Sequence, residues 1–364
     1  MKKFIISVLF VFLFSGLFAQ IPAGYYDSAA GLVGTPLKAA LHNIIKNHTV
    51  VSYAGLWTAY STTDKKANGY VWDMYSDIPS GTPPYNFTFG TDQCGSYSVE
   101  GDCYNREHSF PQSLFNSTGS IYSDLFQVYP TDGKVNGQRS NFPLANVGTA
   151  SWTSLNGSKL GISNYVSPDG WYNFSGTAFE PIDDFKGDFA RTYFYIATRY
   201  YTEDAGWSSN GMNIGAEPMP WAICQYLEWS HLDPVSTKEI NRNNAVYGKQ
   251  NNRNPFIDHP EWADSIWGSF LTAGMTHISD FNTISVFPNP CTIKNTKVNI
   301  WSPEKGSFTL KLFNIEGKCI IEKTIEKTTG NIETELNVEV LNKGIYFLNV
   351  SSKNFVSNKK LIIQ

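Results

Sequence analysis

The spacing of apolar residues changes once along this chain of 364 residues, near residues 275–284. Before that point apolar residues recur at intervals of three and four, as they do on one face of a helix. After it they alternate with polar residues between turns, which is the period of a half-buried strand. The length also exceeds that of a usual single domain. The sequence therefore predicts two folded units, residues 20–277 and residues 278–364.

Helical spacing dominates the first of these units. Thr35 and Pro36 are typical of an N-cap and a first helical residue, and apolar positions follow them at helical intervals. A second helix is expected after Asp184, a third over residues 221–229, and a fourth that begins with a cap at Asp233.

The strand signals are fewer in the first unit and dominant in the second. Residues 122–129 contain no Gly or Pro and enough β-forming residues to predict a strand. We therefore expect an α+β unit that is mostly helical and has little regular sheet. In the second unit, turns such as residues 316–317 and 342–344 punctuate period-two runs. This pattern predicts a small all-β, Ig-like sandwich.

The first nineteen residues are typical of a secretory signal. Lys2 and Lys3 precede an apolar run from Phe4 to Phe14, and cleavage is expected after Ala19. A membrane anchor is the alternative, but the run is short for a bilayer span and no later segment supplies one. We expect a monomeric, exported chain, secreted or attached to the cell surface, with no integral membrane segment once mature.

Export also permits disulfide bonds. Cys94 and Cys103 flank a short Gly-rich segment just before a polar motif, so we expect them to pair. Two buried thiols are the alternative. The three remaining cysteines, Cys224, Cys291 and Cys319, are interpreted as core or incidental residues.

Two polar clusters contain the residues best suited to chemistry, residues 105–114 (NREHSFPQSL) and residues 134–141 (KVNGQRSN). Hydrolysis of a phosphodiester requires an activated water, neutralisation of charge in the transition state and help for the departing oxygen. His108 is a candidate base at neutral pH. A hard divalent cation held by Glu107 and the carbonyl oxygen of Asn136 can supply the rest.

Arg139 and the adjacency of two motif residues add further expectations. Arg139 follows Asn136 by three residues, shares a helix face with it, and is a candidate for holding a phosphate. Neighbouring side chains on a flat strand point to opposite faces, so Glu107 and His108 need a strand end or a bulge to act on one phosphate. Pro111 is consistent with such an end. A zinc site is disfavoured because no HExxH or CxxC occurs.

Four long blocks between residues 22 and 270 resemble the bacterial secreted endonuclease I family in order and spacing. The blocks are NREHSFPQSLF, DLFQVYPTDGKVNGQRSNFP, FEPIDDFKGDFARTYFYIATRY and YLEWSHLDPVSTKEINRNNAVYGKQNNRNPFIDHPEW. The resemblance implies a ββα-metal, or His-Me finger, site that cleaves DNA, and often RNA, to 5′-phosphate and 3′-hydroxyl ends. It also implies that His108 is the general base and that Glu107 and Asn136 bind Mg²⁺, with Ca²⁺ or Mn²⁺ as alternatives.

The resemblance does not identify the arginine that stabilises the product. Some relatives stabilise the product with an arginine in an insertion between the two clusters, and the connection is short here. Arg139 and Arg106 are the alternative replacements.

The charge of the first unit conflicts with a polyanionic substrate. Residues 20–277 hold 15 Lys and Arg against 24 Asp and Glu, a net charge of −9, whereas residues 278–364 carry +3. Nucleic acid normally binds basic surface, so we expect a local patch. The candidates for substrate binding beside the motifs are Arg106, Lys134 and Asn141. Further basic candidates are Lys186, Arg191, Arg242, Lys249 and Arg253.

Three other polar residues invite a functional interpretation. Glu180 is a candidate for orienting a ligand or Arg191. His259 and His231 are interpreted as structural, the first in a proline-flanked loop and the second at a helix end.

The second unit has a resemblance of its own. Residues 286–290 (VFPNP), then LFNIEGK, LNKGIYFLNV and a basic KKLIIQ ending, resemble the sorting domain of type IX secretion. This implies that the secretion machinery is a partner and that the tail is removed or used for attachment. A generic Ig-like accessory domain is the alternative. For the whole chain, the alternative to a nuclease is a surface adhesin or glycan-binding module.

Overall fold

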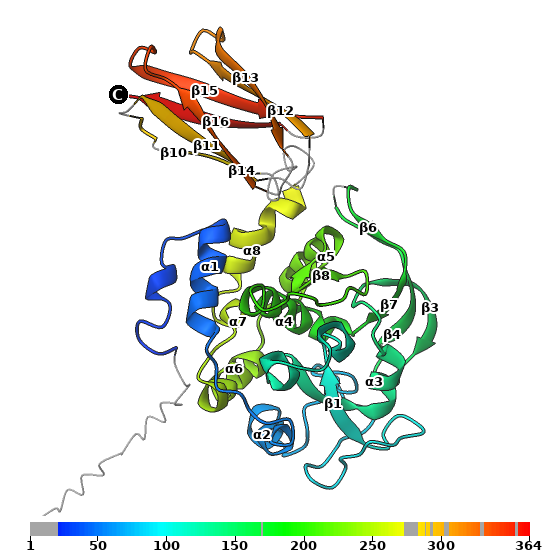
Figure 1. Cartoon of the computed structure of the whole chain (residues 1–364). Helices are drawn as coiled ribbons and strands as arrows, with labels where there is room; N and C mark the ends of the chain where they lie inside the picture. Colours follow the sequence, from blue (N-terminus) through cyan, green and yellow to red (C-terminus); the bar gives the residue numbers. More distant parts are fainter. Residues whose placement is uncertain are drawn as a thin grey trace, which may run out of the picture. The chain divides into compact units, whose positions relative to one another are not determined.

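The computed structural model describes residues 21–168, 170–272, 283–287, 289–291, 294–301, 306–327, 331–353 and 356–364. It is 31% helical and 27% strand, and it divides into two compact units, Met1–Leu271 and Thr272–Gln364 (Figure 1). The predicted secretory signal lies outside the described residues. No helix in the described part of the chain is long and apolar enough to cross a membrane.

One buried helix, α4 (Lys186–Arg199), is the centre of the first unit. All 14 of its residues are buried, and α1 (Gly34–Ile45) and α5 (Pro220–Leu232) lie close to it (Figure 1). The prediction of a helix after Asp184 is confirmed, and neighbouring residues cover every face of it. The other helices are α2 (Leu56–Thr63), α6 (Thr237–Gln250), α7 (Pro255–Asp258) and α8 (Glu261–Trp267).

The starts of two helices differ from the prediction. α1 begins at Gly34, so Thr35 lies inside the helix and does not cap it. α6 begins after Ser236, three residues later than the cap expected at Asp233. Ser236 and Glu239 form a capping box, in which each side chain accepts a backbone N–H of the other, and this fixes the start of the helix.

A β-strand pair followed directly by a short helix contains both polar clusters. Strand β1 (Tyr104–His108) pairs antiparallel with β2 (Val128–Asp132), and helix α3 (Gly133–Arg139) begins at the next residue. The Asp132 side chain caps α3 by accepting the backbone N–H of Val135. His108 is the last residue of its strand, so the motif lies at a strand end.

The strand predicted over residues 122–129 is wrong for most of its length. A 3-10 helix, η3 (Ser120–Ser123), occupies the start, and only the last two residues belong to β2. The reason is Asp124, whose carboxylate accepts the backbone N–H of Phe126 at 2.9 Å and whose carbonyl accepts that of Val128. Such local bonds hold a turn and compete with strand pairing.

Short strands account for more of the first unit than expected. Three of them form an antiparallel sheet in the order β3-β4-β7, and four more form two-stranded ribbons. Their bounds are β3 (Val147–Thr153), β4 (Lys159–Ser163), β5 (Tyr165–Val166), β6 (Asn173–Phe174), β7 (Thr177–Glu180), β8 (Asn213–Ile214) and β9 (Glu217–Pro218). The remaining 3-10 helices are η1 (Asp27–Ala29), η2 (Gln112–Phe115), η4 (Asp183–Phe185) and η5 (Gly268–Thr272).

The described part of the second unit is all-β, as predicted. Its strands form two antiparallel sheets, in the orders β10-β11-β14 and β13-β12-β15-β16. Both sheets supply residues to one core, including Val298 from the first and Leu310 and Leu348 from the second. The specific Ig-like topology stays a prediction. The bounds are β10 (Thr283–Phe287), β11 (Asn295–Trp301), β12 (Gly306–Phe313), β13 (Cys319–Lys327), β14 (Asn331–Asn337), β15 (Gly344–Ser351) and β16 (Val356–Ile363).

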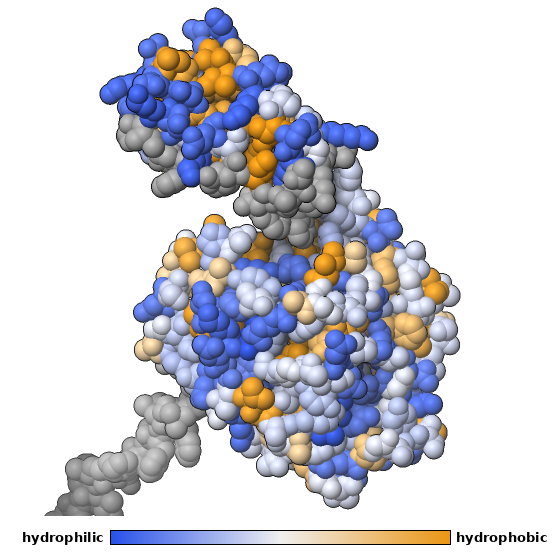
Figure 2. Space-filling view, in the orientation of Figure 1, coloured by the Kyte–Doolittle hydropathy of each residue, from blue (hydrophilic) through white to orange (hydrophobic). Residues whose placement is uncertain are grey.

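Each unit has a hydrophobic core of its own, which predicts that the first unit folds alone. The buried clusters of the first unit lie between Tyr26 and Trp267, and that of the second lies between Ile284 and Ile363. On the face of the first unit seen in Figure 2, hydrophobic residues are scattered among hydrophilic ones. A chain of residues 20–271 should therefore keep the unfolding free energy that the first unit has in residues 20–364, to within about 0.5 kcal/mol. Calorimetric melting of the two chains measures this, and an unfolded shorter chain would contradict it.

Candidate active site

Helix α3 lies against strand β1 so that the two polar clusters meet. The amide Nδ2 of Asn136 donates to Oδ1 of Asn105 at 2.8 Å, and Nη1 of Arg139 donates to Oε1 of Glu107 at 2.8 Å. Asn105 and Glu107 are two residues apart on β1 and so share one face of the strand. Asn136 and Arg139, one turn apart on α3, therefore contact two residues of β1 that are two positions apart. Both candidate metal ligands, Glu107 and Asn136, take part in these contacts.

The Glu107 carboxylate is buried, with 3% of the residue exposed. Its Oε1 atom accepts hydrogen bonds from Arg139 and from the Tyr75 hydroxyl, both at 2.8 Å. No side chain in the described part of the chain donates to Oε2. Burial raises the pKa of Glu107, while the charge of Arg139 and the Tyr75 hydroxyl oppose that rise. The protein therefore holds the carboxylate mainly through Oε1.

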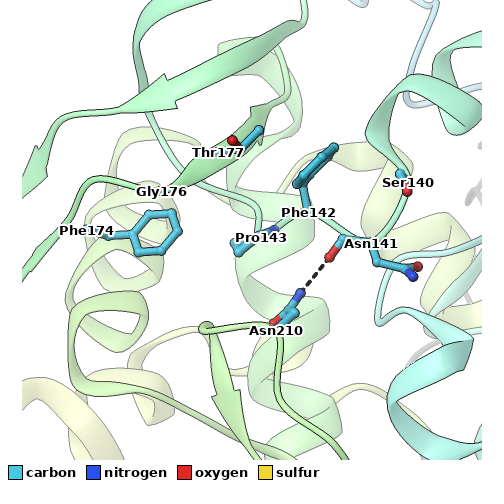
Figure 3. A pocket seen from close by; sticks show the side chains of 8 residues that line it. All are labelled: Ser140, Asn141, Phe142, Pro143, Phe174, Gly176, Thr177 and Asn210. Carbon is cyan, nitrogen blue, oxygen red and sulfur yellow. Dashed lines mark hydrogen bonds between the residues drawn. The ribbon is translucent and has the colours of Figure 1, made fainter.

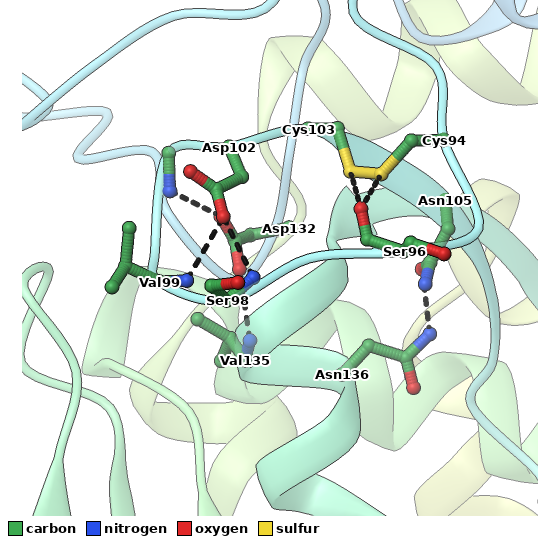
Figure 4. The surroundings of a disulfide bond; sticks show 11 residues. Cys94, Ser96, Ser98, Val99, Asp102, Cys103, Asn105, Asp132, Val135 and Asn136 are labelled. Carbon is green, nitrogen blue, oxygen red and sulfur yellow. Dashed lines mark hydrogen bonds between the residues drawn. A yellow bond between two sulfur atoms is a disulfide. The ribbon is translucent and has the colours of Figure 1, made fainter.

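Asn136 presents an amide oxygen. Its NH₂ group is bound to Asn105, and Figure 4 shows the side-chain oxygen pointing away from that residue. Among the described residues no cluster of three or more His, Cys, Asp or Glu side chains is arranged to hold a metal ion. A carboxylate oxygen and an amide oxygen nevertheless fit a hard cation such as Mg²⁺, which binds few protein oxygens and keeps several waters.

His108 is buried with a defined tautomer. Its Nε2 atom lies 3.0 Å from the carbonyl oxygen of Tyr122. A carbonyl can only accept, so Nε2 carries the proton and Nδ1 is the basic nitrogen. The imidazole stacks on the Tyr122 ring, with centroids 5.2 Å apart. Burial lowers the pKa of His108 to about 4, which keeps the ring neutral at pH 7.

Arg106 lies on the same face of β1 as His108, two residues before it. Its guanidinium carbon is 3.6 Å from the centroid of the Tyr53 ring and 4.6 Å from that of Trp57, and Nη1 donates to the Tyr53 carbonyl at 2.8 Å. The Tyr53 ring also stacks on His108. No salt bridge among the described residues includes Arg106. A half-buried guanidinium without a carboxylate partner is therefore held beside the candidate base.

Arg139 has a different environment from the one predicted. It is fully buried and donates to the Glu107 carboxylate, to the His108 carbonyl at 2.9 Å and to the Ser109 carbonyl. Its guanidinium also contacts the Tyr193 hydroxyl on α4 at 3.4 Å. These contacts use both terminal nitrogens, and the side chain is fully buried, so Arg139 positions Glu107 and the end of β1 and does not face a substrate phosphate.

Most of the predicted basic patch is also buried in ion pairs. The pairs are Lys186 with Glu180, Arg191 with Glu239, Arg242 with Asp64 and Arg253 with Asp258. These four cations are therefore not available to a substrate, and their assignment to a patch is wrong. Glu180 accepts the Val147 backbone N–H at 2.9 Å in addition to Lys186, so it supports a strand and does not orient Arg191. Lys249 and Asn141 are exposed, and Lys134 is half-buried on α3.

A disulfide joins Cys94 and Cys103, with Cα atoms 5.7 Å apart, and closes a loop beside α3 (Figure 4). Tyr97, in this loop, lies against the helix at Gly133 and Gly137. A Cβ atom at either glycine would overlap the Tyr97 ring. The sequence interpretation missed Tyr97, although two glycines four residues apart in so short a helix are a signal of close packing.

The remaining cysteines and two histidines have structural surroundings. Cys224 and Cys291 are buried and Cys319 is exposed. His259 stacks on Trp262 with centroids 4.1 Å apart, and His231 lies 3.0 Å from the Asp264 carboxylate near the end of α5.

The end of β1 and helix α3 thus carry a neutral imidazole, a carboxylate, an amide and a guanidinium without a carboxylate partner among the described residues, which are the groups that a nuclease needs. The chain belongs to the endonuclease I family, because residues 33–261 match the model of the family Endonuclease I. Residues 285–364 match the model described as Secretion system C-terminal sorting domain, which confirms the predicted type IX sorting domain.

Named relatives agree with this assignment. Extracellular ribonucleases from Bacillus subtilis (strain 168) and Bacillus amyloliquefaciens are each 35% identical over 253 residues, which is 67% of this chain and 78% of the relative. Endonuclease-1 from Buchnera aphidicola subsp. Acyrthosiphon pisum is 28% identical over 137 residues, 38% of this chain and 45% of the relative. The chain is therefore a secreted or cell-surface nuclease, and the adhesin alternative is not supported.

The buried ion pair of Arg139 with Glu107 predicts a large stability difference between two arginines. Arg139→Met leaves a buried carboxylate without its partner and should lower the free energy of unfolding by about 3–5 kcal/mol. Arg106→Met removes a stacked guanidinium that has no carboxylate partner and should cost about 1 kcal/mol. Urea unfolding followed by tryptophan fluorescence measures both, and equal losses would contradict the structural role of Arg139.

Proposed function

We propose that this chain is a metal-dependent, non-specific endonuclease that hydrolyses phosphodiester bonds of DNA and RNA and leaves 5′-phosphate ends. The proposed centre is of the ββα-metal, or His-Me finger, kind, formed by β1, β2 and α3. The hydrogen bond from His108 Nε2 to the Tyr122 carbonyl is the observation that carries the proposal, because it leaves Nδ1 as a base of fixed orientation. The ribonuclease names of two relatives support RNA as a substrate.

His108 acts on the attacking water in this proposal. Nδ1 accepts a proton from the water, and the Tyr122 carbonyl stabilises the ring as it becomes charged. Stacking on Tyr122 keeps the imidazole in one orientation throughout. The ring is neutral beforehand because burial lowers the pKa of His108 to about 4.

Glu107 and Asn136 hold the cation through Oε2 and the amide oxygen. When bound, a divalent cation neutralises charge on the phosphate and assists the leaving oxygen. Arg139 keeps the Glu107 carboxylate in place through Oε1, so the orientation of Oε2 depends on α3. We propose Mg²⁺; Ca²⁺ and Mn²⁺ also take oxygen ligands, and activity with each decides between them.

In this proposal Arg106 holds the substrate phosphate. Arg139 was the other candidate for this role. Nη1 is bound to the Tyr53 carbonyl, and stacking on Tyr53 and Trp57 orients the rest of the guanidinium. A planar guanidinium offers paired donors to a phosphate. Lys134 and Asn141, on α3 and just after it, are the further substrate contacts in this proposal.

The base assignment predicts a large and specific loss of activity. His108→Ala should lower the rate of plasmid cleavage with Mg²⁺ by about 10²–10⁴-fold, the usual contribution of a general base. EDTA should abolish cleavage by the parent chain. His231→Ala is the matched control, because His231 is half-exposed and pairs with Asp264. Full activity of His108→Ala would contradict the assignment of His108 as the base. Cleavage that persists in EDTA would contradict the metal dependence.

The role of Arg106 predicts a change in salt dependence. Arg106→Ala should lower kcat/KM at least about tenfold, and the slope of log(kcat/KM) against log[salt] should become shallower by about one unit, the contribution of one phosphate contact. Added guanidinium should restore part of the activity. Lys343→Ala, at an exposed cation of the second unit, serves as the control. An unchanged slope without guanidinium rescue would show that Arg106 is only structural.

A further inference from the structure

A pocket of about 390 Å³ lies directly after helix α3, which carries Asn136 (Figure 3). Its wall consists of the chain segment that follows α3, the end of the β6–β7 connection and one residue of a loop ahead of β8. The lining residues are Ser140, Asn141, Phe142, Pro143, Phe174, Gly176, Thr177 and Asn210. The pocket is thus continuous in sequence with the second polar cluster.

Two aromatic rings give the pocket flat apolar surfaces. In Figure 3, Phe142 and Phe174 lie on either side of Pro143. Phe142 is 36% exposed, so a face or edge of its ring is open to a ligand. Phe174 is fixed in place, because it stacks on Trp221 with centroids 4.2 Å apart and planes inclined by 7°. The backbone of Gly176 lies so close to the Phe174 ring that a Cβ atom there would overlap it.

The backbone beside these rings is held and strained. Ser140 has a φ of +50°, in the region that favours glycine, and it ends α3 immediately after Arg139. Such strain persists where surrounding contacts enforce it, and it clusters at functional sites. Asn210 supplies one of those contacts, since its Nδ2 donates to the Asn141 carbonyl at 2.8 Å (Figure 3). The pocket wall is therefore a built feature and not a loose loop.

The lining of the pocket carries no charge. None of its eight lining residues is acidic, although residues 20–277 carry a net charge of −9, so the pocket does not repel a polyanion. Ser140, Asn141 and Thr177 add hydroxyl and amide groups to the lining. Flat aromatic surface with a few such groups is the composition that binds an unpaired nucleobase.

We propose that this pocket binds one unpaired nucleobase of the substrate strand, stacked on Phe142, and that the enzyme therefore cleaves single-stranded nucleic acid faster than duplex. The inference rests on the proposed nuclease function and names the substrate class of that site. A base in a duplex must first unpair and unstack, which costs a few kcal/mol, whereas a single strand presents it directly. Every base can stack on an aromatic ring. The pocket therefore favours single strands over duplexes without favouring any base sequence.

An abasic scan of a short single strand tests the pocket. A fluorescent oligonucleotide with a single phosphodiester among phosphorothioate linkages, which confine cleavage to that bond, carries one abasic residue at each site in turn, and the full chain cleaves it with Mg²⁺. The parent chain should lose at least about fivefold in kcat/KM at one position, the effect of losing one stacked base. Phe142→Ala should show a similar loss on the intact strand, no further loss at that abasic position, and an unchanged rate on a duplex hairpin.

Two variants separate stacking from folding. Phe142→Leu keeps an apolar side chain without an aromatic face and should behave like Phe142→Ala, with an unchanged melting temperature. Phe347→Ala makes the same change at a 47% exposed phenylalanine of the second unit and should cleave like the parent.

The outcomes distinguish the pocket from the nuclease function itself. Equal cleavage rates at every abasic position would overturn the base-binding pocket. Losses from Phe142→Ala and from the abasic residue that multiply when the two are combined would also overturn it. In both cases, cleavage of the intact strand would still support the nuclease function. A parent chain that cleaves no strand with Mg²⁺ would overturn the proposed function and, with it, the base-binding pocket.

Discussion

The buried contact between Arg139 and Glu107 is the interaction on which the active site depends. Through one guanidinium it joins α3 to the Glu107 carboxylate and to the last carbonyls of β1, and it reaches the Tyr193 hydroxyl of the central helix α4. Tyr193 itself donates to the Ser109 carbonyl at 2.6 Å. A buried arginine is tolerated only with such partners. Because this arginine is used to assemble the site, Arg106 is the guanidinium left beside His108.

The same use of cations inside the fold limits how a net-acidic unit can attract an acidic polymer. Lys186, Arg191, Arg242 and Arg253 are buried in ion pairs and add no local positive surface, so the negative net charge is felt outside. In the proposed function, binding then depends on short-range contacts: a cation between Glu107 and Asn136, the Arg106 guanidinium, and stacking of a base. Few phosphate contacts mean weak binding and fast release, which suits repeated turnover better than long residence.

Sequence patterns predicted the helices and the motif residues, which depend mainly on neighbouring residues. They did not predict the features that depend on contacts between distant residues. The positions of α4 and α5 followed from apolar spacing, and the ligand and base candidates followed from the two motifs. The turn at Asp124 did not, because its local hydrogen bonds are completed by Tyr195 and Tyr200, which donate to the other carboxylate oxygen from more than seventy residues away. The hydroxyl that holds Glu107 belongs to Tyr75, thirty-two residues before it, and no motif identifies it.

Helix α3, which contains most of the second motif, is held in place by contacts from outside the helix. A helix of seven residues with two glycines is unstable alone, so outside contacts must hold it. Asp132 caps its start, Tyr97 covers Gly133 and Gly137, and Arg139 anchors its end on Glu107. Most of the motif thus serves to hold the helix in place, and in the proposed function the amide oxygen of Asn136 is the group that binds the cation. The glycines that weaken the helix are the same residues that let the disulfide-closed loop hold it against β1.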